Sequence, residues 1–242
     1  MIEDGNRTSE PRDVKTDTKK LQVLQACETW SSRILGGWLP GVSIWEAKHR
    51  VGLALWEDMQ TARDLRTRLW ELRVSKPDRM PESELLARLM ERTVSCQNEF
   101  ELVAGLFLGL KRKMAECCRA YLEKAHPVWD APTLPLLEKA LAKLESQCAW
   151  AEDFLKEHDQ VELTRSWLEY LGKVIDASGV FGGKADSFPA APPTYQCLLP
   201  FPEAKRDERF ETSLSGFDRP DIEDHDAHVK WQFANYAMEM QA

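Results

Sequence analysis

The sequence predicts an all-α protein, built as an antiparallel helical bundle followed by a long irregular C-terminal arm and a final helix. Three observations support this fold class. Apolar residues recur at a spacing of three and four over several long segments, the connections between these segments are short, and no strand-like alternation of apolar and polar residues occurs. The 242 residues, of which 43% are hydrophobic, are enough to fill a sizeable core. We therefore expect one helical bundle over residues 18–176.

The first part of the chain contains a polar lead and two helices. Residues 1–17 are rich in charge and poor in apolar residues, which predicts a disordered lead. An amphipathic segment, 21–35, ends at the sequence "GGWLPGV". Residues 43–74 have a helical pattern that ends before "SKPDRMP", whose two prolines cannot continue a helix.

Three further helical segments complete the predicted bundle. The segment 82–124 has the most regular apolar spacing in the chain and is expected to form one long helix. The turn "HPVWDAPT" follows, with Asp130 as a predicted N-cap and Pro132 in the first helical turn. Helices are then expected from this turn to about Lys156 and over 160–175.

The composition changes at Ala177, where proline, glycine and charged residues become frequent. Residues 177–227 therefore predict an extended arm, which either wraps the bundle through its aromatic residues or links it to another unit. Residues 228–242 predict an amphipathic helix that must dock on another surface, because an isolated helix of this length is marginal in water. We expect it to dock on a partner chain. Its apolar stripe consists of Val229, Phe233, Tyr236 and Met240.

Charge and hydropathy exclude several classes of partner. The net charge of -8 and the pI near 5.3 argue against a nucleic-acid partner, which would require a basic surface. No run of about 18 apolar residues is present, so we expect no membrane span. The polar N-terminus lacks the apolar core of a secretory signal, which leads us to expect a cytoplasmic protein.

The six cysteines predict reduced thiols. They form no C-x-x-C pair and have no spacing typical of a disulfide framework. Adjacent Cys117 and Cys118 lie within an apolar helical pattern, where a free cysteine behaves as a small hydrophobic residue.

Glu46 and His49 form an E-x-x-H pair in the segment "IWEAKHRVGLALWED". Residues three apart on a helix project from one face and can hold a metal ion between them. A step of about 100° per residue, however, places Glu46 nearly opposite the apolar face and His49 at the edge of that face. If the pair binds no metal, we expect Glu46 to be exposed and His49 to lie at a boundary between helices.

Several phrases resemble a family of ferritin-like helical proteins of largely unassigned biochemistry. They are "WLPGVSIWEAKHRVGLALWED", "LRTRLWELR", "HPVWDAPT", "RDERF" and "ANYAMEMQA", and the similarity spans most of residues 36–242. The resemblance implies a ferritin-like bundle and iron as a cofactor. It also implies that longer relatives continue into a second helical domain after the equivalent of Glu239, where this chain stops.

A di-iron site in such a bundle uses two E-x-x-H units and two further carboxylates. Glu99, Glu101 and Glu145 are the residues that could complete a site with Glu46 and His49. The second unit departs from the pattern, because the residue three positions after Glu145 is a cysteine. A second, weaker metal candidate is the acidic and histidine-rich sequence "DIEDHDAH" at 221–228, which can equally be a solvated hinge.

Two functions remain open from the sequence. The first is a metal-dependent, di-iron type oxidase or oxygenase acting in a small-molecule pathway, with the catalytic residues unassigned. The second is a non-catalytic helical interaction module that binds a helical partner chain or self-associates as a homo-oligomer. The absence of a nucleotide-binding loop and of a G-x-S-x-G motif excludes the common nucleotide-dependent and serine-hydrolase classes.

Overall fold

The computed structural model describes residues 14–77, 83–182, 186–190 and 202–205. Every regular element within these ranges is a helix, and none of the described residues forms a strand. The predicted all-α helical bundle is therefore confirmed. The described part of the chain contains no helix that is both long enough and apolar enough to cross a bilayer.

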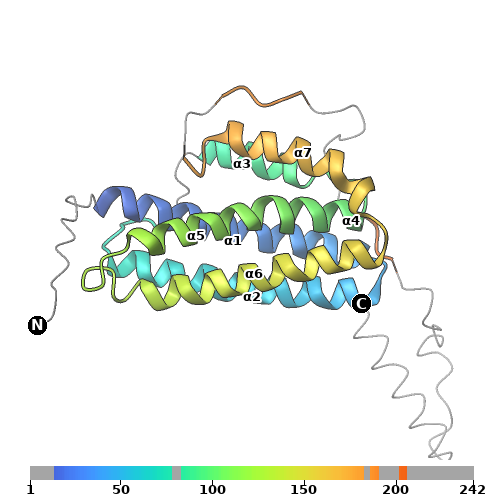
Figure 1. The fold of residues 1–242 in the computed structure, drawn as a ribbon. Helices are drawn as coiled ribbons and strands as arrows, with labels where there is room; N and C mark the ends of the chain where they lie inside the picture. Colours follow the sequence, from blue (N-terminus) through green and yellow to red (C-terminus); the bar gives the residue numbers. More distant parts are fainter. Residues whose placement is uncertain (1–13, 78–82, 183–185, 191–201, 206–242) are drawn as a thin grey trace, which may run out of the picture.

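The described residues form four long helical rods, which lie side by side in the body of the molecule (Figure 1). Two shorter helices pack along one side of it. The rods are α1 (Val14–Trp38), α2 (Trp45–Glu71), the continuous run α4 (Glu99–Leu102), η2 (Val103–Lys111) and α5 (Arg112–Lys124), and α6 (Leu134–Glu157); the shorter helices are α3 (Ser83–Thr93) and α7 (Val161–Ser178).

A tight connection places α1 and α2 against each other. The short helix η1 (Leu39–Gly41) follows α1 directly, and Pro40 fixes its backbone. The described arm residues pack on this connection, because Lys205 N donates to the Pro40 carbonyl oxygen at 2.8 Å. A Cβ atom at Gly41 would lie 2.6 Å from Pro202, so only glycine allows this contact.

The central helical run contains a π-helical segment, η2, whose hydrogen bonds close wider turns than those of an α-helix. Gly105 within η2 allows α7 to approach closely, since a Cβ atom there would lie 2.5 Å from Trp167 Nε1. The same indole nitrogen donates to the Glu101 carbonyl oxygen at 2.8 Å. Trp167 is completely buried and joins α7 to the bundle.

The predicted helix boundaries differ from the structure in several places. Asp130 is not the N-cap of α6: that helix starts at Leu134 after Thr133, and the Asp130 side chain accepts hydrogen bonds from His126 N and Tyr121 Oη instead. Helix α1 continues through the two glycines at which we expected it to end and reaches Trp38.

Helix α1 begins at Val14, within the lead that we expected to be disordered up to residue 17. The expected single helix over 82–124 is interrupted after Thr93, and a new helix starts at Glu99. Asn98 causes this restart, because its side chain accepts a hydrogen bond from Glu101 N at 2.9 Å and so caps the helix.

The buried residues form one hydrophobic core shared by all of the helices. The described cysteines are free, and four of these five are buried, in agreement with the predicted reduced thiols. The expected acidic metal candidate at 221–228 and the C-terminal helix at 228–242 lie outside the described residues.

Candidate functional site

The predicted E-x-x-H pair lies on the surface of α2. Glu46 is in the first turn of this helix and is exposed, as expected for a residue that is not a ligand. His49 is also exposed, so it lies further from the core than the helix boundary that we predicted. The pair therefore faces away from the interior of the bundle.

Glu99 and Glu101 have structural partners at the start of α4. Glu99 accepts hydrogen bonds from Ser43 N at 2.6 Å and Ser43 Oγ at 2.7 Å, and thereby ties α4 to the loop before α2. Glu101 accepts a hydrogen bond from Gln97 N at 2.8 Å. Together with the Asn98 cap this is a variant of the capping box, in which an acidic side chain satisfies a backbone N–H ahead of the helix.

Glu145 lies on the exposed face of α6, where it pairs with Arg119 at 2.7 Å. Cys148 is buried, and its thiol lies 3.2 Å from the Phe107 carbonyl oxygen. Within the described ranges, no three His, Cys, Asp or Glu residues come together as a group that could hold a metal ion. The predicted ligands therefore occupy separate positions in the described structure, on the surface of α2, at the start of α4 and on the exposed face of α6.

The interior of the bundle holds a cluster of charged and polar side chains, the core ionic cluster, from four different helical segments. Lys111 Nζ lies 2.7 Å from Asp58 Oδ2, and both side chains are completely buried. Lys143 Nζ lies 2.6 Å from Glu28 Oε2 and 3.2 Å from Asp58 Oδ1. Gln147 Oε1 accepts a hydrogen bond from Lys111 Nζ at 2.8 Å and completes the cluster.

Burial and mutual attraction shift the pKa values of this cluster. Burial raises the pKa of Glu28 to about 7, although Lys143 opposes the shift. Burial lowers the pKa of Lys111, although Asp58 opposes that change. For Lys143 the effect of burial is outweighed by Glu28 and Asp58, so the pKa of Lys143 is raised.

Two ammonium groups thus supply the positive charge between the buried carboxylates. In ferritin-like di-iron bundles the facing helices project carboxylates and histidines inward to bind metal ions. Here the inward-facing set contains Lys111 and Lys143, and these groups would repel a metal cation placed between Glu28 and Asp58.

The core ionic cluster was not predicted, although the sequence contains two signals of it. Asp58 lies on the same face of α2 as buried Val51 and Leu65. Lys111 ends the apolar run "VAGLFLGL". A single charge within an apolar stripe indicates a buried ion pair when a second stripe in the chain has an opposite charge.

A second face of α2, on which tryptophan and methionine side chains alternate with arginine and histidine, points away from the core. This face is formed by eight residues whose spacing along the helix alternates between four and three positions. That spacing is typical of a helix that packs against another helix. This face lies about 130° around the helix from the buried one. We call it the α2 seam; it consists of Trp45, His49, Gly52, Trp56, Met59, Arg63, Arg66 and Trp70.

The centre and the C-terminal end of the α2 seam are open to solvent. Trp56 is 62% exposed, Trp70 is 53% exposed and Met59 is 49% exposed. The Arg66 guanidinium lies 4.4 Å from the centre of the Trp70 ring, a cation–π geometry that orders both side chains. On α1, the Ser32 hydroxyl lies 3.2 Å from the Met59 sulfur, so α1 borders the centre of the seam.

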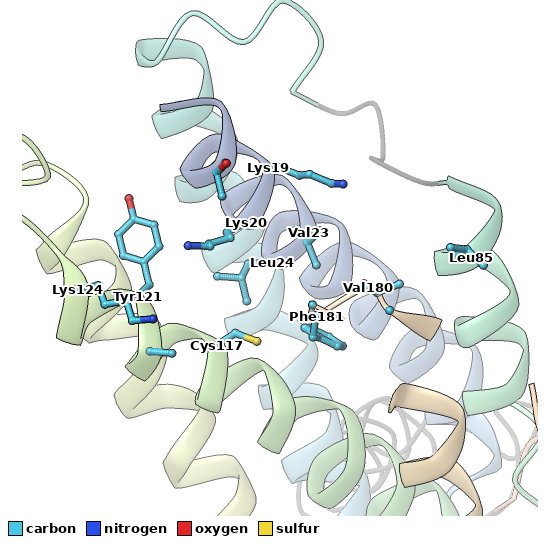
Figure 2. Close-up of a pocket in the computed structure, with 14 residues that line it drawn as sticks. Lys19, Lys20, Val23, Leu24, Leu85, Cys117, Tyr121, Lys124, Val180 and Phe181 are labelled. Atoms are coloured by element: carbon cyan, nitrogen blue, oxygen red, sulfur yellow. The ribbon is translucent and has the colours of Figure 1, made fainter. Parts of the chain in front are cut away.

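A pocket of about 620 Å³ opens between the N-terminal part of α1, the end of α5 and the turn that follows α7 (Figure 2). Its walls include Val23, Leu24 and Phe181, and Tyr121 closes one side. Three lysines, Lys19, Lys20 and Lys124, line it as well, and none of the lining residues is acidic.

Comparison with known proteins gives no match: no protein family, no curated protein and no solved structure is significantly similar to this chain.

Proposed function

We propose that this protein is a non-catalytic helical module that self-associates through the α2 seam. The observation that supports this proposal most directly is that α2 has one face buried in the bundle and a second face that exposes large apolar side chains to solvent. Tryptophan, methionine and arginine are the residue types that are enriched where proteins bind one another. Trp56, Met59 and Trp70 place three of these side chains in solvent along one helix face.

The order of residues in the α2 seam favours a second copy of the chain over an unrelated partner. Trp45 and Trp70 lie equally far from the midpoint of the seam, and so do Trp56 and Met59. When two copies of a helix pair antiparallel about a two-fold axis, residues at equal distances on either side of the midpoint meet. Each tryptophan would then contact a large apolar side chain of the second copy.

The size of the seam is compatible with an interface of modest area. Tryptophan side chains bury about 150–250 Å² each, so the exposed parts of Trp56 and Trp70 contribute on the order of 250 Å² per chain. A stable interface buries about 800 Å² per partner. The other exposed residues of the seam, including Met59 and Arg63, supply further area.

The proposal keeps the ferritin-like arrangement of four long helices and departs from the oxidase function that the resemblance implies. The departure rests on the core ionic cluster, in which Lys111 and Lys143 neutralise the buried carboxylates. It also rests on the three glutamates that were predicted to complete a metal site. Glu99 binds Ser43, Glu101 accepts a hydrogen bond from Gln97 N, and Glu145 pairs with Arg119. These residues stabilise the fold.

Light scattering coupled to size exclusion tests the proposal. The wild-type chain should have the mass of a dimer, and Trp56→Arg should weaken the dimer by about 1,000-fold, because a central tryptophan contributes about 2 kcal/mol in each of the two copies. Trp129→Arg is the matched control, since Trp129 is 73% exposed but lies in the turn between α5 and α6. A wild-type monomer at high concentration, or equal effects of both substitutions, would refute self-association through the seam.

A complementary-charge pair separates self-association from binding of another protein. In the antiparallel arrangement position 56 meets position 59 of the second copy. Trp56→Glu/Met59→Glu and Trp56→Lys/Met59→Lys should each be monomeric alone and form a mixed dimer at low salt. Two monomers that remain apart when mixed would contradict the proposed pairing.

A further inference from the structure

The pocket between α1, α5 and the turn after α7 has the size of a small-molecule site. Its volume of about 620 Å³ lies within the range of about 300–1,000 Å³ found for ligand pockets. It is formed by segments far apart in the sequence, because Leu85 of α3 and residues 179–182 complete the wall opposite α5. The packing of three helices and the turn after α7 therefore shape it together.

The inner wall of the pocket is apolar. Leu24 and Val23 are buried side chains of α1, and the ring of Tyr121 is buried on α5. Burial raises the pKa of the Cys117 thiol, which therefore stays protonated at neutral pH and adds a weakly polar surface. Phe181 closes the wall on the side away from Tyr121 (Figure 2).

The mouth of the pocket is cationic. Lys20 and Lys124 come from facing helices, and both side chains belong to exposed residues. Lys20 Nζ lies 6.0 Å from the centre of the Tyr121 ring and 3.4 Å from Asp17, an acid outside the pocket lining. The chain as a whole has a net charge of -8. The lining of the pocket, in contrast, contains three lysines and no acidic residue, so it is locally cationic.

We infer that this pocket binds a single-chain amphiphile with an anionic head, of which a long-chain carboxylate is the simplest example. The tail lies against Leu24, Val23 and Phe181, where each buried methylene gains hydrophobic stabilisation. The carboxylate stays at the mouth, where Lys20 and Lys124 attract it and water still solvates it. This site is separate from the α2 seam, and the inference does not depend on self-association.

Calorimetric titration of the full chain with dodecanoate below its micellar concentration tests the inference. One dodecanoate should bind per chain. Decanoate, which is two methylenes shorter, should bind about 15-fold more weakly, because each methylene contributes about fourfold in affinity. Dodecanol has the same tail without the charge and should bind about tenfold more weakly than dodecanoate.

Substitutions locate the binding to this pocket. Ala120 is exposed on α5 and lines the pocket, so Ala120→Trp should fill the space and abolish binding while the melting temperature is retained. Lys20→Ala/Lys124→Ala should weaken binding about tenfold. The matched control is Lys139→Ala/Lys156→Ala, which removes the same charge from exposed positions on α6 and should leave binding unchanged.

Three results would overturn the inference. They are no heat of binding with dodecanoate, binding that Ala120→Trp leaves intact, or equal losses in the two double-lysine variants. Vesicles that contain anionic lipid form a further arm. Binding to these vesicles without binding of monomeric dodecanoate would assign the lysines to a membrane surface and would also overturn the inference.

Discussion

Glu28 gives the core ionic cluster a measurable pH dependence. Its pKa rises from 4.5 in the unfolded chain to about 7 in the folded protein, because burial disfavours the charged carboxylate. The folded state therefore binds more protons than the unfolded state between these two values. The contribution of Glu28 to the free energy of unfolding is therefore fully present below about pH 4.5 and is lost as the pH rises through 7.

The size of this effect follows from the shift. One pKa unit corresponds to about 1.4 kcal/mol, so Glu28 should remove about 2–3 kcal/mol of unfolding free energy between pH 5 and pH 8. Glu28→Gln cannot ionise and should lack this loss. The other buried groups remain in the variant, so the difference between the two proteins reports the ionisation of Glu28 together with its effect on Lys143.

Urea denaturation of both proteins at pH 5, 6, 7 and 8 measures this difference. Wild type should lose stability relative to Glu28→Gln as the pH rises, while the control Glu138→Gln, at an exposed position of α6, should follow wild type at every pH. A difference between wild type and Glu28→Gln that is constant from pH 5 to pH 8 would refute the account of Glu28.

Further predictions concern the core, the helix starts and metal content. Lys111→Met should cost about 3–5 kcal/mol in urea denaturation because it leaves Asp58 with one partner fewer in the core, and adding Asp58→Leu should restore part of the loss. Gly105→Ala should lower the melting temperature by several degrees, since the new Cβ atom would collide with Trp167; an unchanged melting temperature would contradict the observed packing. Asn98→Ala should cost about 1 kcal/mol through loss of the α4 cap, whereas a loss near zero would argue against that cap. Aerobic loading with iron followed by desalting should leave substoichiometric iron by elemental analysis, and one or two tightly held iron atoms per chain would restore the metal hypothesis.

The helical fold was predictable because the apolar spacing is strong in the long segments. Helix α2, expected over 43–74, spans Trp45–Glu71, and the N-terminal boundary of α6 lies at Leu134, directly after the predicted turn. The break before α4 was missed, although "NEFE" contains the signature of a capping box. Apolar periodicity continues across this break, and periodicity alone does not show where a helix stops.

The candidate sites were less predictable, because they depend on which faces of different helices meet. Glu46 and His49 have the spacing of ligands, but tertiary packing orients their side of α2 toward solvent. Asp58 and Lys111 are separated by 53 positions, and only the packing of α2 against the central rods brings them together. The pocket likewise combines residues from four parts of the chain.

The most direct test of self-association through the α2 seam is a cross-linking experiment between two variants, each with one cysteine introduced on the seam. Gly52 and Arg63 lie equally far from the midpoint of the seam, so each should face the other in the second copy. A Cβ atom at Gly52 would have only an ordinary contact with Leu39, 3.9 Å away, so cysteine is tolerated there. Both variants would have Cys117 and Cys197 replaced by serine.

An equimolar mixture of Gly52→Cys and Arg63→Cys should form a disulfide-linked dimer on mild oxidation, visible by non-reducing electrophoresis. Gly52→Cys alone should not, because its two copies would be about 16 Å apart along the helix pair and a disulfide requires Cα atoms within about 7 Å. A cross-link in the mixture and its absence in each single variant is the predicted result. No cross-link in the mixture, or equal cross-linking of Gly52→Cys with itself, would contradict the antiparallel α2 pairing.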